Sequence, residues 1–167
     1  MANTYTLIEA KTLGSSTASI TFSSIPSTYT DLIIQWSGRS TTASYGVGSS
    51  LTVNGSPTYS GRYLQGTSAG AGSGTQSIMN AGVGTASTAT ANTFGSASVY
   101  IPNYTSSANK SFSADAVSEN NAADALTFLN AGLATLTSAI NTITIAPNDG
   151  SNWVQYSTFY LYGISNS

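Results

Sequence analysis

The apolar residues of this 167-residue chain fall in short runs that alternate with polar residues, and Gly, Pro, Asn and Ser separate the runs. The most apolar run spans residues 31–39, where alternation places Leu32, Ile34 and Trp36 on one face. A period of two is the period of a β-strand, whose successive side chains point to opposite faces. We therefore expect this chain to fold into many short strands.

The same pattern predicts strands elsewhere in the chain, and we place the strand at 31–39 centrally. The expected strands span residues 5–9, 18–22, 31–39, 51–55, 59–64, 94–101, 110–117, 140–146 and 157–164. Asn54-Gly55 accepts positive φ at both positions and predicts a tight hairpin between two of them. Residues 1–167 are thus expected to form a single all-β domain, an antiparallel β-sandwich. Two sheets of about four strands each would make it a jelly roll.

Two segments depart from the strand pattern. Residues 66–92 are mostly Gly, Ala, Ser and Thr, which predicts a long loop that is either mobile or ordered by a neighbouring subunit. In residues 122–139, Ala125, Leu126, Leu129 and Leu133 recur at roughly helical spacing, but Thr, Asn and Gly interrupt them. The sequence does not decide between helix and strand for this segment. We therefore expect the fold to contain at most one short helix.

Charged residues make up only 6% of the chain, and the net charge is −2. The four basic residues are scattered, whereas a nucleic-acid surface needs clustered cations. No apolar stretch approaches the ~18 residues of a membrane-spanning helix. Residues 1–5 lack the basic and apolar regions of a secretory signal. These observations predict no nucleic acid, no membrane and synthesis in a cytoplasm.

The chain contains no His and no Cys, which removes the common nucleophilic triads and zinc sites. Residues 66–70 match G-x-S-x-G, but that motif needs a histidine partner. Residues 148–152 predict a turn rather than a calcium site, because a single carboxylate offers too little charge. The sequence leaves open a carboxylate pair such as Asp31 with Asp115. We expect no enzyme activity, no cofactor and no metal.

Aromatic residues gather in the last fifth of the chain, where Trp153, Tyr156, Tyr160 and Tyr162 are the candidate contact residues. Strand alternation sends Tyr160 and Tyr162 outward. Outward tyrosines can form a subunit interface or stack on sugars. The alternative is that these side chains pack within the protein.

Two runs carry a resemblance to a known group. Residues 18–40, ASITFSSIPSTYTDLIIQWSGRS, resemble a recurring block in small virion structural proteins of tailed phages, especially phages of aquatic bacteria. Residues 159–164, FYLYGI, resemble the terminal strand of that group. The resemblance covers about a fifth of the chain. It implies a β-sandwich displayed on the surface of the virion, commonly as a trimer.

The resemblance predicts a non-enzymatic structural protein of a bacteriophage, with phage capsid or tail proteins as partners. The first strand begins within five residues of Met1, which leaves no room for a fibre shaft. We therefore expect a capsid decoration or cement protein on the head. The alternative is a tail-fibre or receptor-binding module that contacts the host surface, including its glycans.

Overall fold

A computed structural model describes residues 4–55, 57–119, 121 and 124–165 of the chain. The described residues contain twelve strands and no helix, and hence no helix that crosses a membrane. The strands are β1 (Tyr5–Thr12), β2 (Ile20–Phe22), β3 (Asp31–Gly38), β4 (Gly46–Val53), β5 (Tyr59–Thr67), β6 (Gly70–Gln76), β7 (Asn80–Thr85), β8 (Gly95–Ile101), β9 (Lys110–Ser118), β10 (Leu126–Ala134), β11 (Ile143–Pro147) and β12 (Thr158–Ile164).

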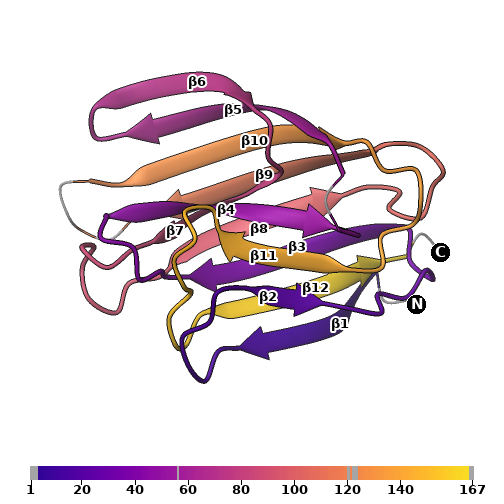
Figure 1. Ribbon diagram of the computed structural model, residues 1–167, viewed down its shortest axis with the longest axis horizontal. Coiled ribbons are helices and arrows are strands. Elements are labelled where there is room, and N and C mark those ends of the chain that lie inside the picture. Colours follow the sequence, from indigo (N-terminus) through magenta and orange to yellow (C-terminus); the bar gives the residue numbers. More distant parts are fainter. Residues whose placement is uncertain (1–3, 56, 120, 122–123, 166–167) are drawn as a thin grey trace.

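The strands form two antiparallel sheets that pack face to face, so the predicted antiparallel β-sandwich is confirmed. The larger sheet has eight strands in the order β1-β12-β3-β8-β9-β10-β5-β6, and the smaller has four in the order β2-β11-β4-β7. The division is therefore not the even one of a jelly roll. The small sheet covers the middle of the large one, and β5 and β6 extend beyond it (Figure 1).

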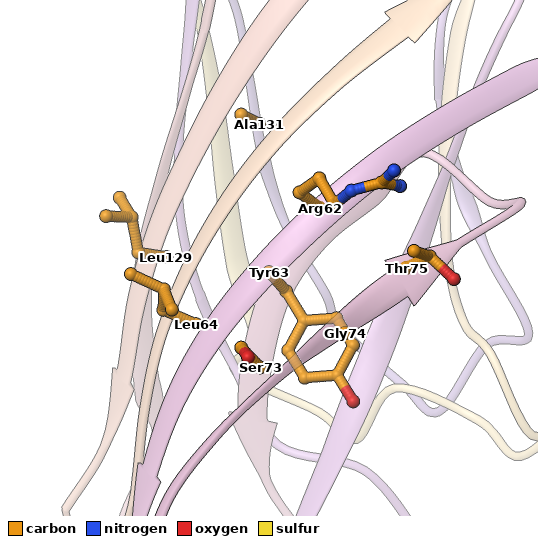
Figure 2. A pocket seen from close by; sticks show the side chains of 8 residues that line it. All are labelled: Arg62, Tyr63, Leu64, Ser73, Gly74, Thr75, Leu129 and Ala131. Atoms are coloured by element: carbon orange, nitrogen blue, oxygen red, sulfur yellow. The ribbon is translucent and has the colours of Figure 1, made fainter.

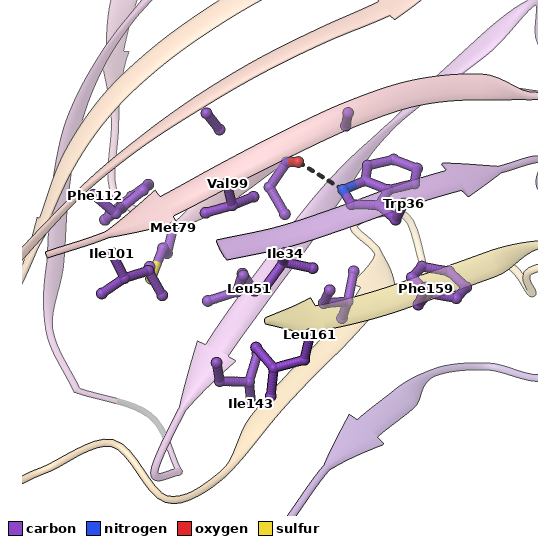
Figure 3. Packing of buried hydrophobic residues seen from close by; sticks show 14 of the residues in the cluster. Ile34, Trp36, Leu51, Met79, Val99, Ile101, Phe112, Ile143, Phe159 and Leu161 are labelled. Atoms are coloured by element: carbon purple, nitrogen blue, oxygen red, sulfur yellow. Dashed lines mark hydrogen bonds between the residues drawn. The ribbon is translucent and has the colours of Figure 1, made fainter. Parts of the chain in front are cut away.

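The core lies between the sheets and follows the predicted alternation. Leu32, Ile34 and Trp36 on β3 are at most 2% exposed and point toward the small sheet. The ring of Trp36 stacks on Phe159 at 5.9 Å between centroids and lies 5.3 Å from Trp153. Figure 3 shows this aliphatic and aromatic layer between the strands. Each large buried ring removes 150–250 Å² of surface from water, which makes this cluster a main source of stability.

Strand β7 packs unusually close to the large sheet because small residues face each other there. All six of its residues are buried, and it lies against β8, β9 and β10. A Cβ atom placed on Gly95 of β8 would lie 2.7 Å from the Cα of Gly84 and 2.9 Å from the carbonyl oxygen of Val83. Glycine is therefore required where the two backbones approach.

Residues 66–92 do not form the long loop that composition predicted. They contain the end of β5, the whole of β6 and β7, and a turn region. Arg39 holds that turn region by donating hydrogen bonds to four backbone carbonyls, those of Ser87, Ala89, Thr90 and Thr93, at 2.9–3.3 Å. The segment is thus ordered by contacts within the chain, and no neighbouring subunit is needed.

The Asn54-Gly55 pair adopts positive φ at both residues, at 46° and 95°, as predicted. It does not make a hairpin, however, because β4 joins the small sheet and β5 joins the large one. The Asn54 side chain turns the chain by accepting hydrogen bonds from the backbone of Asn141 and Thr142. The flanking strands therefore separate after the turn.

The helical alternative for 122–139 is wrong for the described residues 124–139. Leu126–Ala134 form β10, which pairs along its full length with β5 and β9. Pairing on both sides outweighs the helical spacing of the leucines. As a result, Leu129 and Leu133 lie on the face of the sheet that points away from the core.

Candidate functional site

The outer face of the eight-stranded sheet, the side turned away from the small sheet, is the most apolar exposed surface. The structure describes seven exposed large hydrophobic side chains, and six of them lie on this face. They are Tyr5, Leu7, Leu64, Val117, Leu129 and Leu133. An apolar surface of this kind on a single chain usually marks a contact site. We therefore take the outer face as the candidate functional site.

One end of the outer face is aromatic. Strand register places Tyr162 between Leu7 of β1 and Ile33 of β3, and Ile33 lies opposite Tyr100 of β8. Tyr160 lies two residues along β12 on the same face, as alternation predicted. We call these five residues the tyrosine patch. Its rings are partly buried, so their edges and hydroxyl groups are what a partner would meet.

The sequence-predicted contact residues do not all belong to this surface. Tyr160 and Tyr162 do, whereas Trp153 is fully buried and donates from Nε1 to the carbonyl of Ile145 at 3.3 Å. Tyr156 is 68% exposed, but it lies in the turn before β12 with a φ of 70°. The structure therefore brings together two of the four residues.

The opposite end of the outer face is aliphatic. Leu129 of β10 pairs directly with Leu64 of β5, and the two side chains lie side by side in Figure 2. Val117 and Leu133 flank them on β9 and β10. We call these four residues the leucine patch. A hollow of about 480 Å³ lies over β10, β5 and β6, and residues of the patch help to line it.

The carboxylates of the outer face do not form a catalytic pair. Asp31 accepts hydrogen bonds from the Tyr100 hydroxyl and the backbone N–H of Asn103, both at 2.8 Å. The Tyr100 pKa is raised, chiefly by that hydrogen bond. Strand spacing and register put Asp31 and Asp115 roughly 16 Å apart, two strands and four residues away from each other. Glycosidase carboxylates lie about 5–9.5 Å apart.

The two sequence motifs are structural turns. Residues 66–70 close the β5–β6 hairpin, in which Thr67 pairs with Gly70 and Ser68 lies in the turn. At residues 148–152, the Asp149 carboxylate accepts bonds from the backbone N–H and the hydroxyl of Ser151, which confirms the turn interpretation. Burial alone would raise the Asp149 pKa, but hydrogen bonds from Thr42 and Ser151 hold it below its ordinary value. No group of three or more metal-ligating side chains occurs among the described residues.

The leucine patch was missed at the sequence level, since its leucines have helical spacing and the partner strand was not known. The signal that could have revealed it was the strand interpretation of 122–139, in which Leu129 and Leu133 alternate with Phe128 and Asn130.

In the comparisons with known proteins, no family model, no curated protein and no solved structure matches this chain significantly.

Proposed function

We propose that this chain is a non-enzymatic structural protein of a tailed-phage virion that works by assembly through the outer face of its eight-stranded sheet. Its place in this proposal is the outer surface of the head, as a decoration or cement protein. The observation that carries the assembly role is the concentration of exposed apolar side chains on that one face.

The contrast between the two outer surfaces of the sandwich supports this choice. The small sheet presents hydroxyl groups to solvent, such as Thr21 and Thr144, whose side-chain oxygens are 2.9 Å apart. Such a surface is well solvated and needs no partner. The leucine and tyrosine patches are the surface whose burial would remove apolar area from water.

The assignment to a phage particle rests on the resemblance of residues 18–40 and 159–164. In the structure these residues form β2, β3 and β12, three strands of a β-sandwich, which is the fold that the resemblance implies. Threefold assembly and phage capsid partners come from the same resemblance.

A second candidate, a tail-fibre or receptor-binding module, is favoured by the tyrosine patch. Partly exposed aromatic side chains beside hydroxyl and amide groups suit stacking on sugar rings. Gln35 lies opposite Tyr160 on the outer face and donates a hydrogen bond to Ser98 on the next strand. In this case the partner is a host surface glycan.

Antibodies against the recombinant protein, used to label purified virions in electron microscopy, test the proposal. We expect label distributed over the head. Label confined to the tail tip would favour the receptor-binding candidate. Absence of the protein from purified virions, judged by mass spectrometry, would contradict both.

A further inference from the structure

The leucine patch carries two opposite charges on its flanks. Arg62 of β5 lies opposite Ala131 of β10, and Asp115 of β9 lies opposite Leu129 of β10. Both side chains are exposed and point to the outer face. They therefore lie on either side of β10, two residues out of register with each other.

Neither charge is neutralised within the described part of the chain. The ion pair found there joins Lys11 and Glu9, at 2.6 Å on β1. The Arg62 guanidinium donates to the carbonyl of the preceding residue, Gly61, at 3.2 Å, and meets no carboxylate. Asp115 has no hydrogen-bond or ion-pair partner among the described residues, whereas each of the five other carboxylates of the chain has one. Arg62 and Asp115 are thus left free to pair with charges outside the chain.

We propose that the leucine patch binds a second copy of this chain, with Arg62 of one copy paired to Asp115 of the next. The inference rests on the proposed function and names the partner of the same face. One patch supplies both signs of charge, on opposite sides of a single strand. A rotation axis running along β10 brings the β5 side of one copy to the β9 side of its neighbour. This holds for a twofold or a threefold axis, so it agrees with the trimer that the resemblance implies.

The apolar part of the patch fits the same arrangement. Leu64, Leu129 and Leu133 lie close to such an axis, where contacts between identical copies bury the same side chains. The hollow over β10, β5 and β6 offers room for the leucines of a partner. A central apolar cluster with charges at its rim is the usual anatomy of a specific protein interface.

The edge of the sheet at β1 is a poorer site for self-association. Its register is interrupted between Leu7 and Glu9, and the Glu9–Lys11 ion pair occupies it. Bulges and charges on an edge strand block pairing with another strand. The outer face is therefore a better site for self-association than the β1 edge.

Charge reversal and charge exchange test the pairing. Full-length wild type, Arg62→Asp, Asp115→Arg and the double exchange are compared by sedimentation equilibrium across a micromolar range. Each single reversal places like charges together and should weaken association by about 30-fold or more. The double exchange restores opposite charges and should recover most of the affinity. Circular dichroism and thermal unfolding establish that each variant is folded.

Lys11→Asp is the matched control, because it changes the net charge as Arg62→Asp does but lies on β1, away from the patch. It should leave association unchanged. Single reversals without effect, or a double exchange no tighter than the singles, would overturn the inference. The inference would also be overturned if the wild-type protein stayed monomeric at 100 times the highest concentration of that range while antibodies against it still labelled virions. In that case the proposed function would stand.

Discussion

Single residues in this fold are constrained most strongly where backbones approach. Gly95 faces the backbone of Val83 and Gly84, which cannot rotate aside as a side chain can. Gly14, in contrast, has no atom within 4 Å of a Cβ placed on it and lies outside the positive-φ region. The two glycines therefore form a matched pair for testing the packing of β7.

We expect Gly95→Ala to lower the free energy of unfolding by about 2 kcal/mol or more, because the added methyl group forces the sheets apart. Gly14→Ala should change it by no more than about 1 kcal/mol. Urea unfolding followed by tryptophan fluorescence measures both. Equal effects would show that β7 does not pack as closely as described.

Buried tyrosines contribute to how the free energy of unfolding depends on pH at alkaline values. With no histidine in the chain, we expect the free energy of unfolding to be nearly constant between pH 6 and 8. Burial raises the pKa of Tyr104 above its ordinary value of 10.0, and that of Tyr59 likewise. The folded chain thus holds these protons more tightly than the unfolded chain. The stability that these two tyrosines contribute is fully present below pH 10 and is lost as the pH rises through their folded-state pKa.

Tyr104→Phe isolates one of these groups. The free energy of unfolding of this variant should fall less between pH 8 and 11 than that of the wild type. Phenylalanine has no ionisable hydroxyl, so unfolding of the variant releases one proton fewer at alkaline pH. Burial lowers the Lys110 pKa, which has the opposite effect on stability at alkaline pH, but Lys110 is common to both proteins and cancels in the difference. Parallel stability curves for the two proteins would rule out the assigned role of Tyr104.

Among the elements, the turn region 86–94 depends on a residue far away in the sequence. Arg39 follows β3, and its guanidinium spans four carbonyls of the turn. Lysine is a point charge without the planar fork of arginine and cannot make these bonds together. The hydrogen bonds from Arg39 therefore hold this turn region in its conformation, a role that apolar side chains play elsewhere in the fold.

Replacing Arg39 with Lys should raise hydrogen exchange in this turn by about 10-fold or more, since its local stability falls. The amides to follow are those of Ser87, Thr88 and Ala89, which are hydrogen-bonded to backbone carbonyls. Arg62→Lys on the outer face is the control and should leave these amides unchanged. Unaltered exchange in Arg39→Lys would mean that the turn is held by its backbone bonds alone.

The elements also show how far the sequence could predict this fold. Strands with regular alternation were predicted well, and the buried side of β3 and the outward side of β12 are as expected. Strand β6 was not predicted, because its glycines are covered by side chains of β5. The Tyr63 ring lies over Gly74, and a Cβ there would be 2.8 Å from that ring. Such cross-strand cover depends on a register that composition does not reveal.

In the candidate site, too, the sequence predicts what depends on alternation within one strand and misses what depends on the pairing of strands. Alternation within β12 correctly placed Tyr160 and Tyr162 outward. Trp153 lies outside a regular strand, bridged to Thr17 and Ser40, so alternation could not predict that its ring joins the core. The leucine patch required knowledge that β10 lies between β5 and β9.

At the scale of the whole molecule, the two outer surfaces of the sandwich differ in polarity. The sandwich has a hydroxyl-rich outer surface on its small sheet and an apolar outer surface on its large sheet. If the chain works by assembly, the large sheet should be covered in the assembly and the small sheet should stay exposed. The absence of native cysteine allows a single thiol to report on either surface.

The most direct measurement is the rate of maleimide labelling of Leu129→Cys and Thr21→Cys, each compared between the dilute protein and the protein in its assembly. Leu129 is 53% exposed on the large sheet, and Thr21 is exposed on the small sheet. We expect assembly to slow labelling at position 129 by at least about 10-fold and to leave the labelling rate at position 21 unchanged. Equal labelling of position 129 in the dilute and assembled protein would contradict it.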